Sequence, residues 1–113
     1  MSFRVILLPR AEADIETNPQ WWAKNHSVEQ AARRFEAMHE QLRALADFPE
    51  RNGPSAESDD FPYEIRDKLL GLGPRRGYRA VFTIRGDDVY VLTVRRASQG
   101  ALRPDDVVPP PAP

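Results

Sequence analysis

Charged residues recur along the second half of the chain, in segments with the alternating pattern of β-strands. Glu64 and Arg66 are two residues apart in the run 63–69, Arg79 lies in a second run, and Arg96 closes a third. A carboxylate can remove the proton of a ribose 2′-hydroxyl, and guanidinium groups can stabilise the charge that develops on a phosphate. On one surface of a sheet, Glu64 as the base and the three arginines as phosphate ligands could therefore cleave RNA.

This reaction also needs an acid that protonates the leaving oxygen, and the predicted sheet does not supply one. Residues 95–98, after the last strand, are Arg-Arg-Ala-Ser, and an arginine stays protonated at any usable pH. His26 lies in a predicted loop between helices and His39 on a helix. Tyr78 and Tyr90 lie in predicted strands, where packing accounts for both. The missing acid weighs against catalysis.

The same region also has interpretations that need no catalysis. Arg66 and Arg79 could bond acidic groups across the sheet, with Glu64 as one such partner. Arg95 carries the planar fork that suits carboxylates and phosphates, which fits a binding role. Trp21, if it is exposed, is the type of residue that anchors a protein interface.

The charge of the chain is unevenly distributed. Residues 1–62 carry seven Lys/Arg against eleven Asp/Glu, a net −4, whereas residues 63–103 carry nine against four, a net +5. Asp105 and Asp106 add −2, so that the whole chain is −1. All but two of the basic residues are arginines. The basic segment predicts one face that meets an anionic partner, or alternatively a sheet surface laced with ion pairs.

Composition limits the class of protein. A chain of 113 residues, 41% hydrophobic and 29% charged, is the size and type of one globular domain. It has no cysteine, which excludes disulfides and thiolate metal sites. Its apolar runs are far shorter than the roughly 20 residues that span a bilayer, and residues 4–9 are too short for a secretion signal. We expect a cytoplasmic protein without a membrane partner, metal or cofactor.

The first half of the chain predicts a strand and two helices. Residues 3–8 read as a strand that ends at Pro9, and residues 10–17 as a helix interrupted by Asn18-Pro19. Ser27 begins a second helix, with Gln30 completing a capping box. This helix runs to about Phe48 and carries one apolar stripe, formed by Val28, Ala31, Phe35, Met38, Leu42 and Leu45.

The second half predicts a polar loop, three strands and a tail. Residues 49–62 contain three prolines and a glycine and should be an exposed loop. Strands follow over 63–69, 78–84 and 89–94, with a hairpin turn at 85–88. We expect one domain over residues 1–103 and a disordered proline-rich tail over 104–113. The fold class is α+β, in the order β-α-α-β-β-β, with a helical hairpin on one face of a mostly antiparallel sheet and the other face free.

Six short motifs occur in a characteristic order along this scaffold. They are Pro9-Arg10-Ala11 with Asp14-Ile15; the run of Ala32, Phe35, Leu42, Leu45, Phe48 and Pro49; Tyr63-Glu64-Ile65-Arg66; Gly77-Tyr78-Arg79 with Val81-Phe82; Gly86-Asp87-Asp88-Val89; and Val91-Leu92-Thr93-Val94-Arg95-Arg96. In this order they resemble the RelE/ParE toxin superfamily over residues 3–103.

The resemblance implies a growth-inhibiting toxin held inactive by a cognate antitoxin, which would cover the free apolar surface. RelE-like members cleave messenger RNA on the ribosome, whereas ParE-like members poison DNA gyrase, and both use one scaffold. Arg66 and Arg79 fall where RelE-like nucleases carry catalytic arginines. Such nucleases commonly place a His or Tyr at the end of the last strand, where this chain has neither, and a net charge of −1 suits RNA poorly.

A ParE-like toxin that binds gyrase is therefore the preferred hypothesis, and we lean away from an enzyme. The alternatives are a RelE-like mRNA endonuclease using Glu64, Arg66, Arg79 and Arg96, or a non-toxic, arginine-rich nucleic-acid-binding domain.

Overall fold

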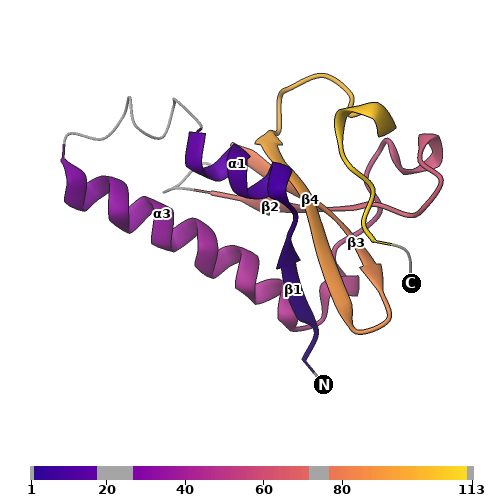
Figure 1. The fold of residues 1–113 in the computed structure, drawn as a ribbon, viewed down its shortest axis with the longest axis horizontal. Coiled ribbons are helices and arrows are strands. Elements are labelled where there is room, and N and C mark those ends of the chain that lie inside the picture. The colour runs from indigo at the N-terminus through magenta and orange to yellow at the C-terminus, as the bar shows by residue number, and fades with distance from the viewer. Residues whose placement is uncertain (1, 18–26, 72–76, 112–113) are drawn as a thin grey trace.

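The protein folds into one mixed sheet with two helices against it (Figure 1). The computed structural model describes residues 2–17, 27–71 and 77–111. The strands are β1 (Arg4–Leu7), β2 (Arg66–Leu70), β3 (Tyr78–Arg85) and β4 (Asp88–Arg96), in the spatial order β1-β4-β3-β2. β1 pairs with β4 in parallel, and the other two pairings are antiparallel. The predicted α+β class is confirmed, as is the predicted order of strands and helices along the described residues.

The β3–β4 hairpin is the centre of the sheet. Gly86 occupies the first central position of its two-residue turn with φ of 59°, the geometry of a type II′ turn. The pairing shifts register between Val81 and Phe82, because Val81 pairs with Thr93 and Phe82 with Val91. Leu92 is therefore the extra residue of a β-bulge in β4.

The helices α1 (Pro9–Thr17) and α3 (Val28–Arg43) cover one face of the sheet. Ala11 and Ile15 of α1 are buried, as their spacing predicts. The hydroxyl of Ser27 accepts a hydrogen bond from the backbone N–H of Gln30, which confirms the predicted N-cap. The helix-side core contains Ala11, Ile15, Met38, Leu42, Leu45, Leu70, Ala80, Phe82, Val89, Val91 and Val94.

The second helix differs from its prediction at both ends of the apolar stripe. Val28 is 86% exposed, because it lies in the first turn of α3, ahead of the residues that reach the core. The α-helix ends at Arg43 and continues as a single 3₁₀ turn over Ala44–Ala46. Phe48 then has a left-handed backbone, with φ of 50°, and its side chain is 69% exposed.

The prediction that the other sheet face is free was wrong. Two segments of the same chain cover it, one between α3 and β2 and one after β4 (Figure 1). A second core forms there from Phe61, Ile65, Val81, Leu92, Leu102 and Val107. Consecutive side chains of a strand point to opposite faces. The apolar runs Ala80-Val81-Phe82 in β3 and Val91-Leu92 in β4 therefore supply apolar side chains to both faces of the sheet, and both faces need cover.

The two covering segments also differ from their predicted exposure. In the stretch 49–62, Pro49, Ser55, Glu57 and Phe61 are buried. Residues 104–111 of the tail, which sequence predicts to be disordered, contact the rest of the domain: Val107 belongs to the second core, Arg10 of α1 donates to the carbonyl of Asp106, 3.2 Å, and Arg85 of β3 to that of Pro111, 2.6 Å. No helix within the described residues is long and apolar enough to cross a membrane.

Candidate functional site

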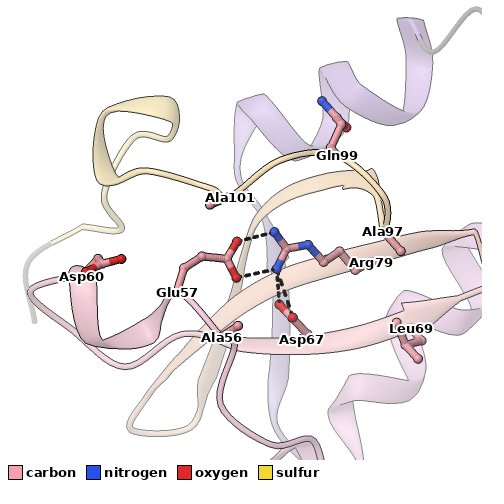
Figure 2. Close-up of a pocket in the computed structure, with 9 residues that line it drawn as sticks. All are labelled: Ala56, Glu57, Asp60, Asp67, Leu69, Arg79, Ala97, Gln99 and Ala101. Carbon is pink, nitrogen blue, oxygen red and sulfur yellow. Dashed lines mark hydrogen bonds and ion pairs between the residues drawn. The ribbon is translucent and has the colours of Figure 1, made fainter.

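Arg79 lies in a cluster of charged side chains on the sheet face away from the helices (Figure 2). Both of its terminal nitrogens donate to the carboxylate of Glu57, one at 3.1 Å and one through a very short contact. Its Nη1 also donates to Asp67 at 3.0 Å. Glu57 comes from the segment before β2, Asp67 from β2 and Arg79 from β3. We call these three residues the Arg79 cluster.

Further hydrogen bonds fix the carboxylates of the Arg79 cluster. Asp67 accepts from the hydroxyl of Ser55 at 2.5 Å. Glu57 accepts from the backbone N–H of Leu102 at 2.8 Å, which joins the segment after β4 to the cluster. Arg79 is 7% exposed, as is Glu57. The cluster therefore ties both covering segments to the sheet through buried, charge-assisted hydrogen bonds.

Charge pairing shifts the pKa of both main partners. The hydrogen bond from Arg79 lowers the pKa of Glu57 to about 2, against the opposing effect of burial. The hydrogen bond to Glu57 raises the pKa of Arg79, again against burial. Both groups therefore stay charged across the physiological range, and neither is suited to proton transfer near neutrality.

A pocket of about 520 Å³ opens beside the cluster. Its walls include the small side chains Ala56, Ala97 and Ala101, with Asp60 and Leu69 at its sides (Figure 2). Because Glu57 and Asp67 already balance Arg79, the pocket does not present a positive charge to a phosphate. The Nε of Arg79 is buried without a hydrogen-bond partner.

The sheet register places the predicted nuclease arginines on opposite faces. Arg66 pairs with Phe82, whose side chain lies in the helix-side core, and side chains directly opposite each other share a face. Arg79 lies three residues before Phe82, so it points to the other face. Arg96 pairs with Tyr78, which packs against the helix-side core. Arg79 is thus separated by the sheet from both Arg66 and Arg96.

The other predicted residues have separate positions and contacts. Glu64 precedes β2 rather than lying in it, and its carboxylate accepts from Arg66 at 3.0 Å. Arg66 also donates to the carbonyls of Glu50 and Asn52, which fixes the turn after α3. Arg95 is half-buried and donates to the carbonyl of Gly100 at 2.9 Å. Trp21 lies outside the described residues.

Sequence reasoning missed Glu57, Asp67 and Ser55. Glu57 lies in a polar stretch whose apolar residues follow neither a helical nor a strand period, so no sequence pattern marks Glu57 as buried. The alternation along β2 does show that Asp67 and Leu69 point to the same face. It does not show that Asp67 bonds Arg79, 12 residues away. Within the described residues, no group of His, Cys, Asp or Glu is arranged to hold a metal ion.

Comparisons with known proteins agree with this fold. A family model described as the ParE toxin of the type II toxin–antitoxin system parDE matches residues 5–100. The fold is similar to a solved chain described as "Chromosomal ParDE TA system from P. aeruginosa", with a TM-score of 0.62 and 20% identity over 84% of this chain and 96% of that one. A search of curated proteins found no match. The family match spans nearly the whole described sheet and both helices. The chain therefore belongs to the ParE toxin family of type II toxin–antitoxin systems.

Proposed function

We propose that this ParE-family toxin inhibits growth by binding its target, with DNA gyrase as that target, and not by cleaving RNA. The proposal rests on one observation: the positive charge of Arg79 is already balanced by the carboxylates of Glu57 and Asp67. A phosphate ligand would have to displace Glu57 and Asp67 from the guanidinium, and would leave two carboxylates unpaired, one of them deeply buried. Such an exchange is costly, since an uncompensated buried charge typically costs 3–5 kcal/mol.

The positions of the remaining arginines support the same proposal. RNA cleavage needs the base and the phosphate ligands around one phosphorus atom. The sheet separates Arg79 from Arg66 and Arg96, and Arg66 is engaged by Glu64 and by two backbone carbonyls. A net charge of −1 gives little general attraction to ribosomal RNA.

A binding toxin needs an exposed recognition surface rather than a reaction centre. Trp21 and Arg95 are the residues that we propose for it. Arg95 is half-buried, its Nε is buried, and the bond from its Nη2 to the carbonyl of Gly100 orients the side chain. We further propose that the toxin acts in the cytoplasm and that a cognate antitoxin covers it until release.

The test compares gyrase and the ribosome as targets of the purified protein. In supercoiling assays we expect inhibition of gyrase and accumulation of cleaved DNA. In translation reactions followed by primer extension we expect intact messages. Arg95→Ala should weaken the effect on gyrase about tenfold, whereas Arg33→Ala, an exposed arginine on α3, should leave it unchanged.

Codon-linked cuts in translated messages would contradict the proposal and favour the RelE-like alternative. In that case Glu64→Gln and Arg96→Ala should each abolish cleavage. These two positions are chosen because both side chains are exposed, whereas replacing the buried Arg79 should disturb the fold as well. Binding of nucleic acid without growth arrest on induction would favour the non-toxic alternative.

A further inference from the structure

The outer edge of β2 is closed by a side chain from a helix. β2 is the last strand of the sheet, so half of its backbone groups point away from β3. The N–H of Asp67 bonds the carbonyl of Gly53 on this side, at 3.4 Å. Because outward groups alternate along a strand, those of Leu69 and Gly71 point the same way.

Gln41 of α3 occupies the backbone groups of Gly71 as a neighbouring strand would. Its amide nitrogen donates to the Gly71 carbonyl at 2.7 Å, and its amide oxygen accepts from the Gly71 N–H at 3.0 Å. One side-chain amide thus supplies both the donor and the acceptor of a strand residue. The amide is held in place by a third hydrogen bond, from its nitrogen to the carbonyl of Ala37, 3.3 Å.

Leu69 is the outward residue that remains. Within the described parts of the chain, its backbone N–H has no partner on the outer side, and its side chain is 49% exposed. A single free residue offers one donor and one acceptor, which is too little to pair a strand. A free Gly71 would double that number and make the open stretch continuous.

A similar closure is found at the other end of the sheet. β1 stops pairing with β4 at Val91, so the N–H of Val94 has no strand neighbour on that side. Asp14 of α1 accepts from this N–H at 3.1 Å and from the hydroxyl of Thr93. Each helix therefore places one polar side chain against an open strand edge, a known means of preventing edge-to-edge association.

We propose that Gln41 is a gatekeeper that prevents the β2 edge from pairing with the β2 edge of a second copy of this chain. The second copy is the fitting partner because an antiparallel edge can pair with itself about a two-fold axis. With that axis at Leu70, Leu69 of each copy lies opposite Gly71 of the other. Four backbone hydrogen bonds then form across the axis, and all four require the groups of Gly71 that Gln41 occupies.

Gln41→Ala tests the proposal, with Glu40→Ala as the control because Glu40 is exposed on the same helix. Sedimentation from 1 to 200 μM should show monomers for the unmodified protein and the control, and a dimer for Gln41→Ala with an association constant at least tenfold higher. Adding Leu69→Pro should restore the monomer, since proline removes an outward N–H without removing a bond to β3.

A monomeric Gln41→Ala protein that is folded and exchanges its Gly71 amide hydrogen faster would overturn the proposal. So would a dimer that Leu69→Pro leaves intact, or an unmodified protein that already dimerises through this edge. If Gln41→Ala does not fold, Gln41→Met keeps a side chain of similar length but releases both the N–H and the carbonyl of Gly71. A dimer of that variant supports the gatekeeper role, and a monomer contradicts it.

Discussion

The Arg79 cluster illustrates how a buried charge can be fixed by more than one partner. Removing an arginine from water costs several kcal/mol, and a single carboxylate rarely offsets that cost. Here Glu57 and Asp67 share the guanidinium, and Ser55 and the Leu102 N–H stabilise the two carboxylates in turn. The cluster joins three chain segments, so its loss should affect the whole second core.

Replacing one carboxylate should therefore destabilise the protein while the neutral amide keeps its shape. Glu57→Gln leaves Arg79 with Asp67 alone and should lower the free energy of unfolding by about 2–3 kcal/mol at pH 7, measured by urea denaturation. Asp60→Asn, an exposed carboxylate beside the same pocket, should change it by less than about 0.5 kcal/mol. Equal effects of the two variants would show that the buried ion pair does not contribute as described.

The lowered pKa of Glu57 predicts how stability depends on acid. Its pKa is about 2 in the folded protein against an ordinary value of 4.5, so the unfolded chain binds the proton first as pH falls. The stabilisation is complete above about pH 5 and is lost between about 4.5 and 2, on the order of 3 kcal/mol in total. Glu57→Gln should show a flatter loss across this window, in denaturation curves at pH 5, 4, 3 and 2.5. A slope equal to that of the unmodified protein would contradict the pKa shift.

Sequence reasoning reached part of this residue-level picture. The interpretation of Arg66 and Arg79 as partners for acidic groups matches their contacts, and Glu64, which the sequence offers as such a partner, bonds Arg66. The true partner Glu57 is 22 residues from Arg79 and belongs to a stretch whose composition indicates an exposed loop. Only the three-dimensional path of that stretch brings the two charges together.

Among the elements, the second helix shows what periodic patterns do and do not predict. The 3–4 spacing correctly identified Met38, Leu42 and Leu45 as core residues and Ser27 as the cap. It failed for Val28, since a period defines a face of the helix but not how far the neighbouring sheet extends along it. Pro49 predicts that the helix ends near Phe48, whereas the α-helix ends at Arg43.

Phe48 adopts a left-handed backbone after this helix, at an energetic cost. A left-handed backbone costs a non-glycine residue roughly 1–2 kcal/mol, and the exposed ring returns little beyond its contact with the guanidinium of Arg51, 5.6 Å from the ring centre. Phe48→Asn should be neutral or stabilising by up to about 1 kcal/mol, because asparagine tolerates this conformation. Phe48→Val, which is β-branched, should destabilise by more than 1 kcal/mol. Thermal unfolding would distinguish the pair, and a more stable valine variant would exclude backbone strain as the cause.

For the whole molecule, the principal difference from the sequence-based picture is the covered second face of the sheet. Unbroken apolar runs in β3 and β4 are consistent with two apolar faces, but the chain after Arg96 has few apolar residues and many prolines, a composition typical of disorder. Two well-placed residues, Leu102 and Val107, are enough to bring it into the second core. An antitoxin therefore meets a sheet whose two faces are both already packed.

Because few side chains anchor the segment after β4, replacing one of them should have a large effect on the stability of the protein. Leu102 is 2% exposed and its N–H bonds Glu57, so Leu102→Ala should lower the free energy of unfolding by about 2–4 kcal/mol. Val108→Ala, six residues later and 68% exposed, should change it by less than about 0.5 kcal/mol. Hydrogen exchange should show the loss first in residues 102–111 and at Ile65 and Leu92, while the helix-side core keeps its protection. Uniform loss across both cores would mean that the two faces unfold as one unit, and an unchanged Leu102→Ala protein would show that the segment after β4 does not stabilise the sheet.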